Sequence, residues 1–420
     1  MCDGYLRMEK THDKPTIFFS NPKVSSANLL QPHLNNTVER IKAAQVDYIL
    51  SIQDSMFLNY TSHKAKTEIG RIGRTGKTDQ YGLIQHNTLC VTNKNEPLGL
   101  IDLQHFHHDE FDAQVRREHR AIENKCDRCW ISASQRRRDL LKGIDKKVIT
   151  VADREGDFFE FLFDLYENQE SFVIRAQHNR ITGTKRRKKG NDKLFDLINR
   201  EEDIGTQVTT IHDVETRAIK EIELKIKTLP KIYFPVPRYP SKQDKSYHAI
   251  SVNVVVAYND DYCWVLLTDL PVSTLEECQQ VITMYRARWH IEDYHKILKT
   301  GYQVDELYLH ASRKAIENAL VMAAVSACRL YWMIYVGRVE GTVKADRLFK
   351  DYEWKALYVY FKEKVPEDAP CLNTVILKIA RLGGYKPHNK ASPPGIKTMW
   401  IGFQSFTIAA QMYHNLSTKT

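Results

Sequence analysis

The stretch Val148-Ile149-Thr150-Val151-Ala152-Asp153 is the clearest indication of the fold class. A short apolar run of this kind is typical of a central strand, and it stops at the aspartate. Further strand candidates lie on both sides of it, and a helix candidate precedes the next strand. The strand candidates are residues 48–52, 82–92, 98–104 and 172–175, and the helix candidate is residues 158–166.

The order of these elements predicts a mixed sheet flanked by helices. The first three strand candidates follow one another through short connections, such as the turn-like residues 93–97, which favours an antiparallel meander. A charged region at 109–145, helical in pattern, separates them from the strand at 148–152. The order of three strands, a helix, a strand, a helix and a strand predicts an α/β fold of mixed strand direction.

The chain changes character after about residue 176, where we predict a β-rich insertion that reaches about residue 270. Ile222, Leu224 and Ile226 alternate with charged residues, which is typical of a half-buried strand. Two more strands are expected at 252–258 and 264–268.

A helix is predicted from about Thr274 to Lys299, with Gly301 at its end. The remaining residues are mainly helical in pattern. The predicted division is an N-terminal helical remnant (1–44), a core (45–310) that contains the insertion at about 177–270, and a helical C-terminal region (311–420).

Composition narrows the class of protein. Lys and Arg number 61 against 52 Asp and Glu, and this excess of positive charge favours a polyanionic partner such as nucleic acid. The chain opens MCDGYLRMEK, without the apolar stretch of a secretory signal, so we expect a cytoplasmic protein with reduced cysteines. Charged and polar residues interrupt the apolar stretch 315–336, which predicts a buried helix and no membrane partner.

The segment 284–299 contains the pattern Y-x2-R-x3-E-x6-K. On a helix its polar residues fall within an arc of roughly 80°, and apolar residues occupy the opposite face. A carboxylate among cations suits a metal ion and phosphate oxygens, whereas the alternative is a solvated face with i,i+4 ion pairs. The polar residues are Tyr285, Arg288, Glu292, Lys296 and Lys299, and the apolar ones are Ala287, Ile291, Tyr294 and Leu298.

This pattern resembles the signature of bacterial insertion-sequence transposases with a D-D-E triad, of the branch called insertion sequence family four. Ile52-Gln53-Asp54-Ser55 resembles the first-Asp strand of that family, and residues 151–157 resemble its second-Asp motif. Leu382-Gly383-Gly384-Tyr385 and the tract 395–400 resemble its C-terminal region. The similarity covers about residues 18 to 415.

The resemblance implies a ribonuclease-H-like catalytic core. It assigns Asp54, Asp153 and Glu292 as the catalytic residues and as ligands of two Mg²⁺ (or Mn²⁺) ions per active site. Two divalent ions neutralise charge on the attacking and leaving oxygens of a phosphodiester, and hard cations prefer carboxylate ligands. The implied function is cut-and-paste DNA transposition: strand cleavage, closure of a DNA hairpin, its opening, and strand transfer to target DNA.

The resemblance also implies contacts to double-stranded DNA at the transposon ends and the target. Trp264 is expected to stack on a flipped base, with a core tryptophan as the alternative. Tyr285 and Arg288 would hold the phosphate beside that base. Arg175, Lys296 and Lys299 match further backbone contacts, and an ordinary surface arginine is the alternative for Arg175.

Other signals carry less weight. Asp102 and Asp157 are rival carboxylates, but Asp54 and Asp153 are preferred because their local sequences match the family. The pair Cys126-x2-Cys129 has no second pair at zinc-ribbon spacing, so its role stays open. The glycines at 70–78 have the wrong spacing for a phosphate loop, so no nucleotide cofactor is expected. The basic run at 185–189 favours a DNA-contacting loop over a solvated tip.

The resemblance begins near Ile17, so we expect most of the family's N-terminal end-binding domain to be missing. The C-terminal region is expected to form a homodimer. The alternative function is therefore a truncated, end-binding-deficient regulator that inhibits transposition through mixed dimers. A structure-directed nuclease is a further alternative. A bacterial, nucleoid-associated location in the cytoplasm is implied.

Overall fold

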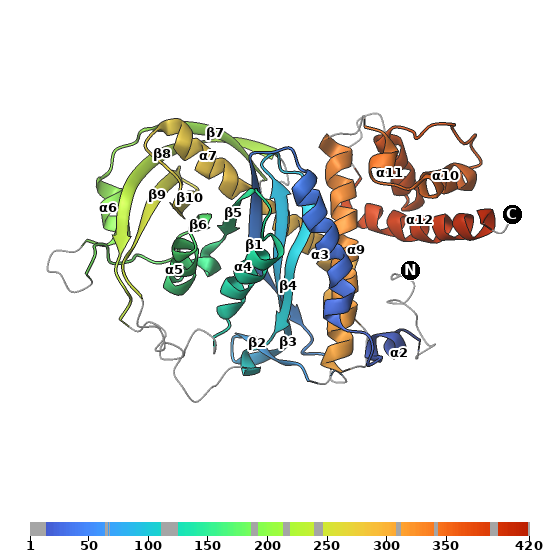
Figure 1. The fold of residues 1–420 in the computed structure, drawn as a ribbon, viewed down its shortest axis with the longest axis horizontal. Helices are drawn as coiled ribbons and strands as arrows, with labels where there is room; N and C mark the ends of the chain where they lie inside the picture. Colours follow the sequence, from blue (N-terminus) through green and yellow to red (C-terminus); the bar gives the residue numbers. More distant parts are fainter. Residues whose placement is uncertain are drawn as a thin grey trace.

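The computed structural model describes residues 14–63, 66, 68–110, 125–185, 192–212, 219–238, 247–307, 312–339, 343–386 and 394–418. The basic run predicted to contact DNA lies outside these residues from Arg186 onward. Within them the chain forms a mixed α/β fold around one large sheet, as predicted (Figure 1).

Ten strands form this sheet in the described part of the chain, in the order β2-β3-β1-β5-β6-β10-β9-β8-β7, with β4 paired to β3. β1 is antiparallel to β3 and parallel to β5, and β5 is parallel to β6. The strands are β1 (Tyr48–Asn59), β2 (Gly70–Thr75), β3 (Thr78–Thr92), β4 (Pro97–Phe106), β5 (Lys147–Ala152), β6 (Ser171–Arg175), β7 (Gly205–His212), β8 (Ile219–Phe234), β9 (Ile250–Tyr258) and β10 (Cys263–Thr268).

The predicted meander is confirmed, but two details of the prediction were wrong. β1 continues to Asn59 because it stays paired with β3 along its whole length, so Asp54 lies inside the strand and not at its end. The glycine-rich residues 70–75 form strand β2, which was not among the predicted strands. Gly82 permits close packing there, since a Cβ on it would lie 1.8 Å from the carbonyl oxygen of Leu58.

The predicted β-rich insertion is continuous with the central sheet. β10 pairs antiparallel with β6, and β9, β8 and β7 extend the sheet beyond it (Figure 1). Helix α6 (Leu194–Arg200) precedes these strands. The insertion therefore forms one edge of the same sheet that carries the predicted catalytic strands.

Two apolar cores cover opposite faces of the sheet because side chains alternate along each strand. In β5, Val151 packs into the core shared with α7 (Leu275–Arg286) and α9 (Arg313–Val339). The next residue, Ala152, packs into the core of α5 (Phe159–Glu167). Helix α4 (Arg128–Leu140) also lies on this second face.

The helix predicted from Thr274 to Lys299 is divided into three segments. α7 ends at Arg286, α8 (Trp289–Lys296) follows, and a π-helical turn covers Ile297–Gly301. Tightened hydrogen bonds replace the α-helical ones at the junction, where the Arg288 N–H donates to the Tyr285 carbonyl at 2.9 Å. Ala287, Ile291, Tyr294 and Leu298 are buried as predicted, but Tyr285 is also buried, at 4% exposed.

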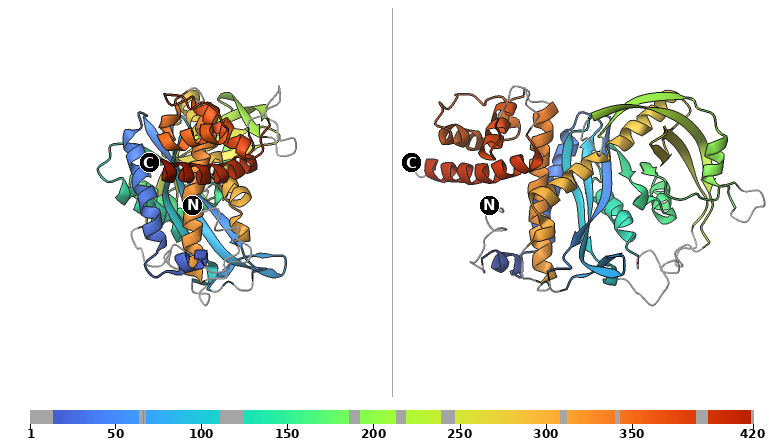
Figure 2. Two further views of the ribbon diagram at one scale, coloured as in Figure 1. Left: turned by 90° about the vertical axis from the view of Figure 1, so that its right-hand side faces the viewer. Right: turned by 180° about the vertical axis from the view of Figure 1, so that it is seen from behind.

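The C-terminal region is helical, as predicted (Figure 2). α9 is long and apolar enough to cross a membrane, but 67% of its apolar stretch is buried inside the protein, which confirms the predicted buried helix. It packs beside α3 (Ser26–Ala43). The other helices of this region are α10 (Asp351–Tyr360), α11 (Leu372–Leu382) and α12 (Ile396–Ser417).

Short elements complete the described part. They are α2 (Lys14–Ser20), the 3₁₀ turns η1 (His108–Glu110), η4 (Arg154–Gly156), η6 (Val304–Glu306) and η7 (Ala345–Arg347), and the π-helical turn η5 (Ile297–Gly301). In the region predicted as helical at 109–145, the described helix is α4.

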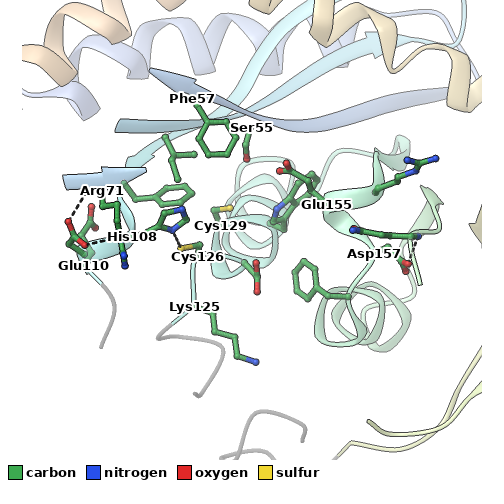
Figure 3. Close-up of a pocket in the computed structure, with 18 of the residues that line it drawn as sticks. Ser55, Phe57, Arg71, His108, Glu110, Lys125, Cys126, Cys129, Glu155 and Asp157 are labelled. Carbon is green, nitrogen blue, oxygen red and sulfur yellow. Dashed lines mark hydrogen bonds and ion pairs between the residues drawn. The ribbon is translucent and has the colours of Figure 1, made fainter. Parts of the chain in front are cut away.

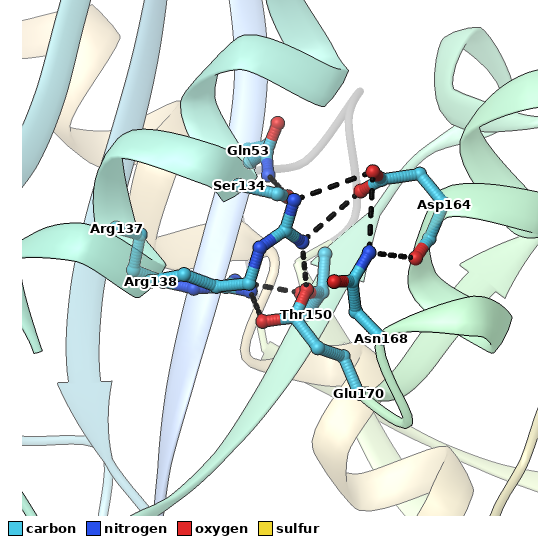
Figure 4. A network of polar contacts seen from close by, with 8 residues as sticks. All are labelled: Gln53, Ser134, Arg137, Arg138, Thr150, Asp164, Asn168 and Glu170. Atoms are coloured by element: carbon cyan, nitrogen blue, oxygen red, sulfur yellow. Dashed lines mark hydrogen bonds and ion pairs between the residues drawn. The ribbon is translucent and has the colours of Figure 1, made fainter. Parts of the chain in front are cut away.

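A buried ionic network fixes α4 against the central strands (Figure 4). Arg137 is 1% exposed and donates to the Thr150 hydroxyl of β5 at 2.7 Å and to the Glu170 carboxylate at 2.5 Å. Arg138 donates to Glu170 at 2.9 Å and to Asp164 of α5 at 3.1 Å. Each buried charge is therefore paired and hydrogen-bonded, which offsets the cost of removing it from water.

We expect Arg137→Met to lower the free energy of unfolding by about 3–5 kcal/mol, because Glu170 would keep its charge near the core with one partner fewer. Urea unfolding followed by circular dichroism measures this loss. Arg74→Met is the control, because it removes an exposed ion pair to Asp79 and should change stability little. Equal small losses in both variants would contradict a structural role for the network.

Candidate active site

Two predicted catalytic aspartates lie side by side on neighbouring parallel strands. Gln53 of β1 is paired with Ala152 of β5, so the next residues along the two strands, Asp54 and Asp153, reach the same level of the sheet. Asp153 directly follows β5 and accepts a hydrogen bond from the Glu155 N–H at 2.8 Å. The juxtaposition follows from the parallel register alone.

Strand alternation places both carboxylates on the face covered by α7, α8 and α9. Ile52 and Val151, two residues before the aspartates, pack into the core on that face. Glu292 lies in the first turn of α8, which packs against β1. The three predicted catalytic carboxylates therefore belong to one side of the sheet.

Arg288 connects Asp54 with Glu292. Its Nη1 lies 3.9 Å from the Asp54 carboxylate, and its Nη2 donates to the Glu292 carboxylate. The Arg288 side chain is only 12% exposed, and its Nε is buried without a hydrogen-bond partner. One guanidinium thus neutralises two of the three carboxylates and retains a spare donor.

The charge balance at Asp54 suits a bound cation. Burial and the neighbouring Asp153 raise the pKa of Asp54 to about 7, although Arg288 acts in the opposite direction. Two carboxylates held together in a desolvated place repel each other, and a divalent cation between them would relieve that repulsion. In the described part of the chain no three His, Cys, Asp or Glu side chains are already gathered as metal ligands. Arg288 contacts both Asp54 and Glu292 there.

Asp54 also has polar neighbours that the sequence analysis did not predict. His295 of α8 lies 3.9 Å from Asp54, and its Nε2 accepts a hydrogen bond from the Asn87 amide at 2.9 Å. Asn87 is in turn bonded to Gln85 at 2.9 Å, and Gln85 to His105 at 3.0 Å. Burial lowers the pKa of His295 to about 3, so the ring is neutral and directs its Nδ1 hydrogen toward Asp54.

The remaining predicted DNA contacts divide into buried and exposed groups. Trp264 is 7% exposed and packs edge-on against Tyr285, with ring centroids 5.5 Å apart, so in this structure it is a core residue. Arg175 ends β6, where it donates to the Cys263 carbonyl at 2.9 Å and lies near the Tyr285 hydroxyl. Burial raises the pKa of Tyr285, whereas Arg288 and Arg175 act in the opposite direction.

Lys296 and Lys299 are exposed, at the end of α8 and in the π-helical turn. Lys299 is close enough to help lower the pKa of His295, which places its charge near the carboxylates. Two exposed lysines beside a carboxylate cluster suit a backbone phosphate approaching that cluster.

The rival carboxylates have structural partners. Asp102 accepts two hydrogen bonds from Arg136, at 2.6 and 2.9 Å. Asp157 is 1% exposed and accepts from the Gln177 and His178 N–H groups and from Arg180. Both carboxylates are thus engaged by protein donors outside the predicted carboxylate cluster.

Paired sheet carboxylates, a helix glutamate, a bridging arginine and exposed lysines are the groups of a metal-dependent enzyme acting on phosphodiesters. The comparisons with known families agree with this class. Residues 131–328 match the family described as "Transposase DDE domain", and residues 325–415 match the "Transposase Tn5 dimerisation domain".

Together the two matches extend over more than half of the 420 residues, and the chain belongs to the DDE transposases. It is thus a metal-dependent enzyme of phosphodiester hydrolysis and transesterification, with a ribonuclease-H-like core. Asp153 and Glu292 lie inside the matched DDE domain, whereas Asp54 precedes it.

We expect Asp54→Asn to raise the thermal unfolding midpoint at pH 8 without metal. The folded chain keeps the proton on Asp54 up to about pH 7, while the unfolded chain releases it near the ordinary value of 3.8, so this group lowers stability as the pH rises between those values. The gain from the substitution should therefore shrink toward pH 4.

Millimolar Mg²⁺ should stabilise the wild type at pH 8 more than Asp54→Asn, because ligand binding to the folded state adds stability. Thermal denaturation monitored by circular dichroism at several pH values, with and without Mg²⁺, measures both effects. A midpoint difference that does not depend on pH would show that Asp54 ionises normally.

Proposed function

We propose that this chain catalyses cut-and-paste transposition of an insertion sequence through DNA hairpins, as in the branch called insertion sequence family four. We further propose that Asp54, Asp153 and Glu292 hold two Mg²⁺ ions. The single observation that carries this proposal is the placement of Asp54 beside Asp153, with Arg288 joining Asp54 to Glu292.

Two bound Mg²⁺ ions would activate the attacking oxygen and neutralise the leaving oxygen of the phosphodiester. The protein supplies the ligands and their orientation. Asp54 and Asp153 are held by rigid strands, whereas Glu292 sits at the rim with its side chain 36% exposed. Arg288 would exchange its carboxylate contacts for a phosphate, which its planar guanidinium binds through two hydrogen bonds.

The same group of residues supports a DNA path toward the carboxylates. Lys296 and Lys299 are exposed, and Arg175 lies near Tyr285, whose pKa Arg288 also affects. In a hairpin the strongly bent end favours extrusion of a base. Stacking of that base on Trp264 requires the Tyr285 ring to move, because the indole is covered by it.

A homodimer would form through α12 in this proposal. Met399, Phe403 and Phe406 bury one side of the helix, whereas large apolar side chains are exposed on another side. At 100° per residue these exposed residues fall within an arc of roughly 80°. They are Ile401, Ile408, Met412 and Leu416, exposed by 39%, 58%, 60% and 68%. Apart from Leu416, these residues lie within the match to the dimerisation domain, which covers residues 325–415.

Glu292→Gln should reduce DNA strand cleavage by about 100-fold or more, because the amide removes a metal ligand without changing side-chain size. The assay uses a supercoiled plasmid that carries the element's own ends, with Mg²⁺, and separates nicked, hairpin-ended and joined products on denaturing gels. Glu276→Gln, on the exposed start of α7, is the matched control and should cut normally.

Hairpin-ended products from the wild type would support the cut-and-paste route. Cleavage that ignores the ends would identify a structure-directed nuclease. Full activity of Glu292→Gln would remove Glu292 from the catalytic set.

The double substitution Ile408→Asp and Met412→Asp should weaken self-association about 100-fold or more, because each apolar side chain contributes about 1.5 kcal/mol or more when buried. Sedimentation velocity over a concentration series measures the dissociation constant. Val208→Asp is the control, since Val208 is 65% exposed on the distant strand β7. An unchanged dissociation constant would place the interface elsewhere.

A further inference from the structure

A cavity borders the face of the sheet opposite to the candidate active site. Figure 3 shows the residues that line it. Its volume is about 1080 Å³, and its walls include Ser55, Phe57 and Trp130. Since side chains alternate along β1, Ser55 and Phe57 point away from the face of Asp54. Cys126 and Cys129 also line this cavity, and the proposed catalytic chemistry uses neither thiol.

The two cysteines lie one turn apart where α4 begins. The Cys129 N–H donates to the Cys126 carbonyl at 3.1 Å, which closes a tight helical turn between them. In such a turn the Cα atoms are about 5 Å apart, inside the range of roughly 4.4–6.8 Å that a disulfide spans. The backbone is therefore already arranged for a Cys126–Cys129 bond.

The surroundings give the two thiols different roles. Cys126 is partly exposed to the cavity, and its Sγ lies 2.8 Å from Nδ1 of His108. An imidazole at this distance can take up the thiol proton and leave a nucleophilic thiolate. Cys129 is 6% exposed, and burial, together with nearby Asp127 and Cys126, raises its pKa. Cys126 is thus suited to be the attacking thiol in a disulfide exchange. The buried Cys129 is suited to react in a second step with the sulfur of Cys126.

We propose that Cys126 and Cys129 form a redox-active dithiol that reacts with low-molecular-weight disulfides. The Cys126 thiolate attacks one sulfur of the small disulfide, which breaks its S–S bond, forms a mixed disulfide and releases one thiolate. Cys129 then attacks Cys126 Sγ and releases the second thiolate. The two protein thiols lose two electrons and two protons, and the small disulfide becomes two thiols.

The direct contact between His108 and Cys126 supports thiol chemistry at this pair. Within the described ranges, no three His, Cys, Asp or Glu side chains gather as metal ligands around the cysteine pair. His108 contacts the sulfur of Cys126 directly, which leaves no room for an ion between them. In a reducing cytosol such a pair would be mainly in the dithiol form. It would form the disulfide when the ratio of small disulfides to thiols rises.

The test treats the reduced full-length protein with oxidised glutathione, blocks free thiols by alkylation and identifies the products by peptide mass spectrometry. The wild type should lose two thiols and gain a Cys126–Cys129 bond. Cys129→Ser should stop at one glutathione on Cys126, and Cys126→Ser should leave Cys129 as a free thiol. His108→Ala should slow the first step about tenfold, because the thiol loses its proton acceptor.

Cys371→Ser is the matched control, because Cys371 is an exposed cysteine away from the cavity and its removal should leave the internal bond intact. Circular dichroism confirms that each variant is folded. The proposal is overturned if the folded wild type modifies Cys371 and forms no internal bond, or if Cys129 reacts as fast in Cys126→Ser. Stoichiometric zinc in the purified wild type, lost in Cys126→Ser, would overturn it in favour of a metal site.

Discussion

The repulsion between Asp54 and Asp153 is the interaction around which the catalytic half of this transposase is arranged. The parallel register of β1 and β5 forces the two carboxylates together, and burial removes the water that would screen them. Arg288 reduces the repulsion by contacting Asp54 and Glu292 at once. A site of this kind has excess negative charge that a divalent cation can neutralise, and in the proposed function Arg288 would then be free to bind phosphate.

The break between α7 and α8 places the residues of the Y-x2-R-x3-E-x6-K pattern in different surroundings. A straight helix over the whole segment would carry Tyr285 and Glu292 on one exposed face, but the chain tightens at Ala287 and Arg288. Tyr285 is thereby packed against Trp264, while Glu292 remains at the rim. The buried residues Ile291 and Tyr294 hold α8 in place, so that His295 and Asn87 can support Asp54 through neutral polar contacts.

The two faces of the sheet carry separate chemistry. Odd and even residues of β1 point in opposite directions, so Asp54 lies on the face of the candidate active site while Ser55 borders the cavity with the cysteine pair. Helix α4 belongs to the second face, where Ser134 holds the Gln53 amide at 2.9 Å and Arg137 holds Thr150. A change at the start of α4 is therefore connected to both catalytic strands through a few hydrogen bonds.

Local pattern was sufficient to predict the α/β class, the meander, most strands and the apolar face of the motif helix, because periodicity reports burial directly. The Y-x2-R-x3-E-x6-K spacing and the aspartate motifs also identified the class of enzyme. Periodicity does not indicate which strands become neighbours. The pairing of β10 with β6 and of β2 with β3 could therefore not be predicted from it. The burial of Tyr285 and Trp264, the bridge made by Arg288 and the support from His295 and Asn87 all join residues far apart in the chain. Those contacts depend on tertiary packing, because each is made with a residue that is distant in the sequence.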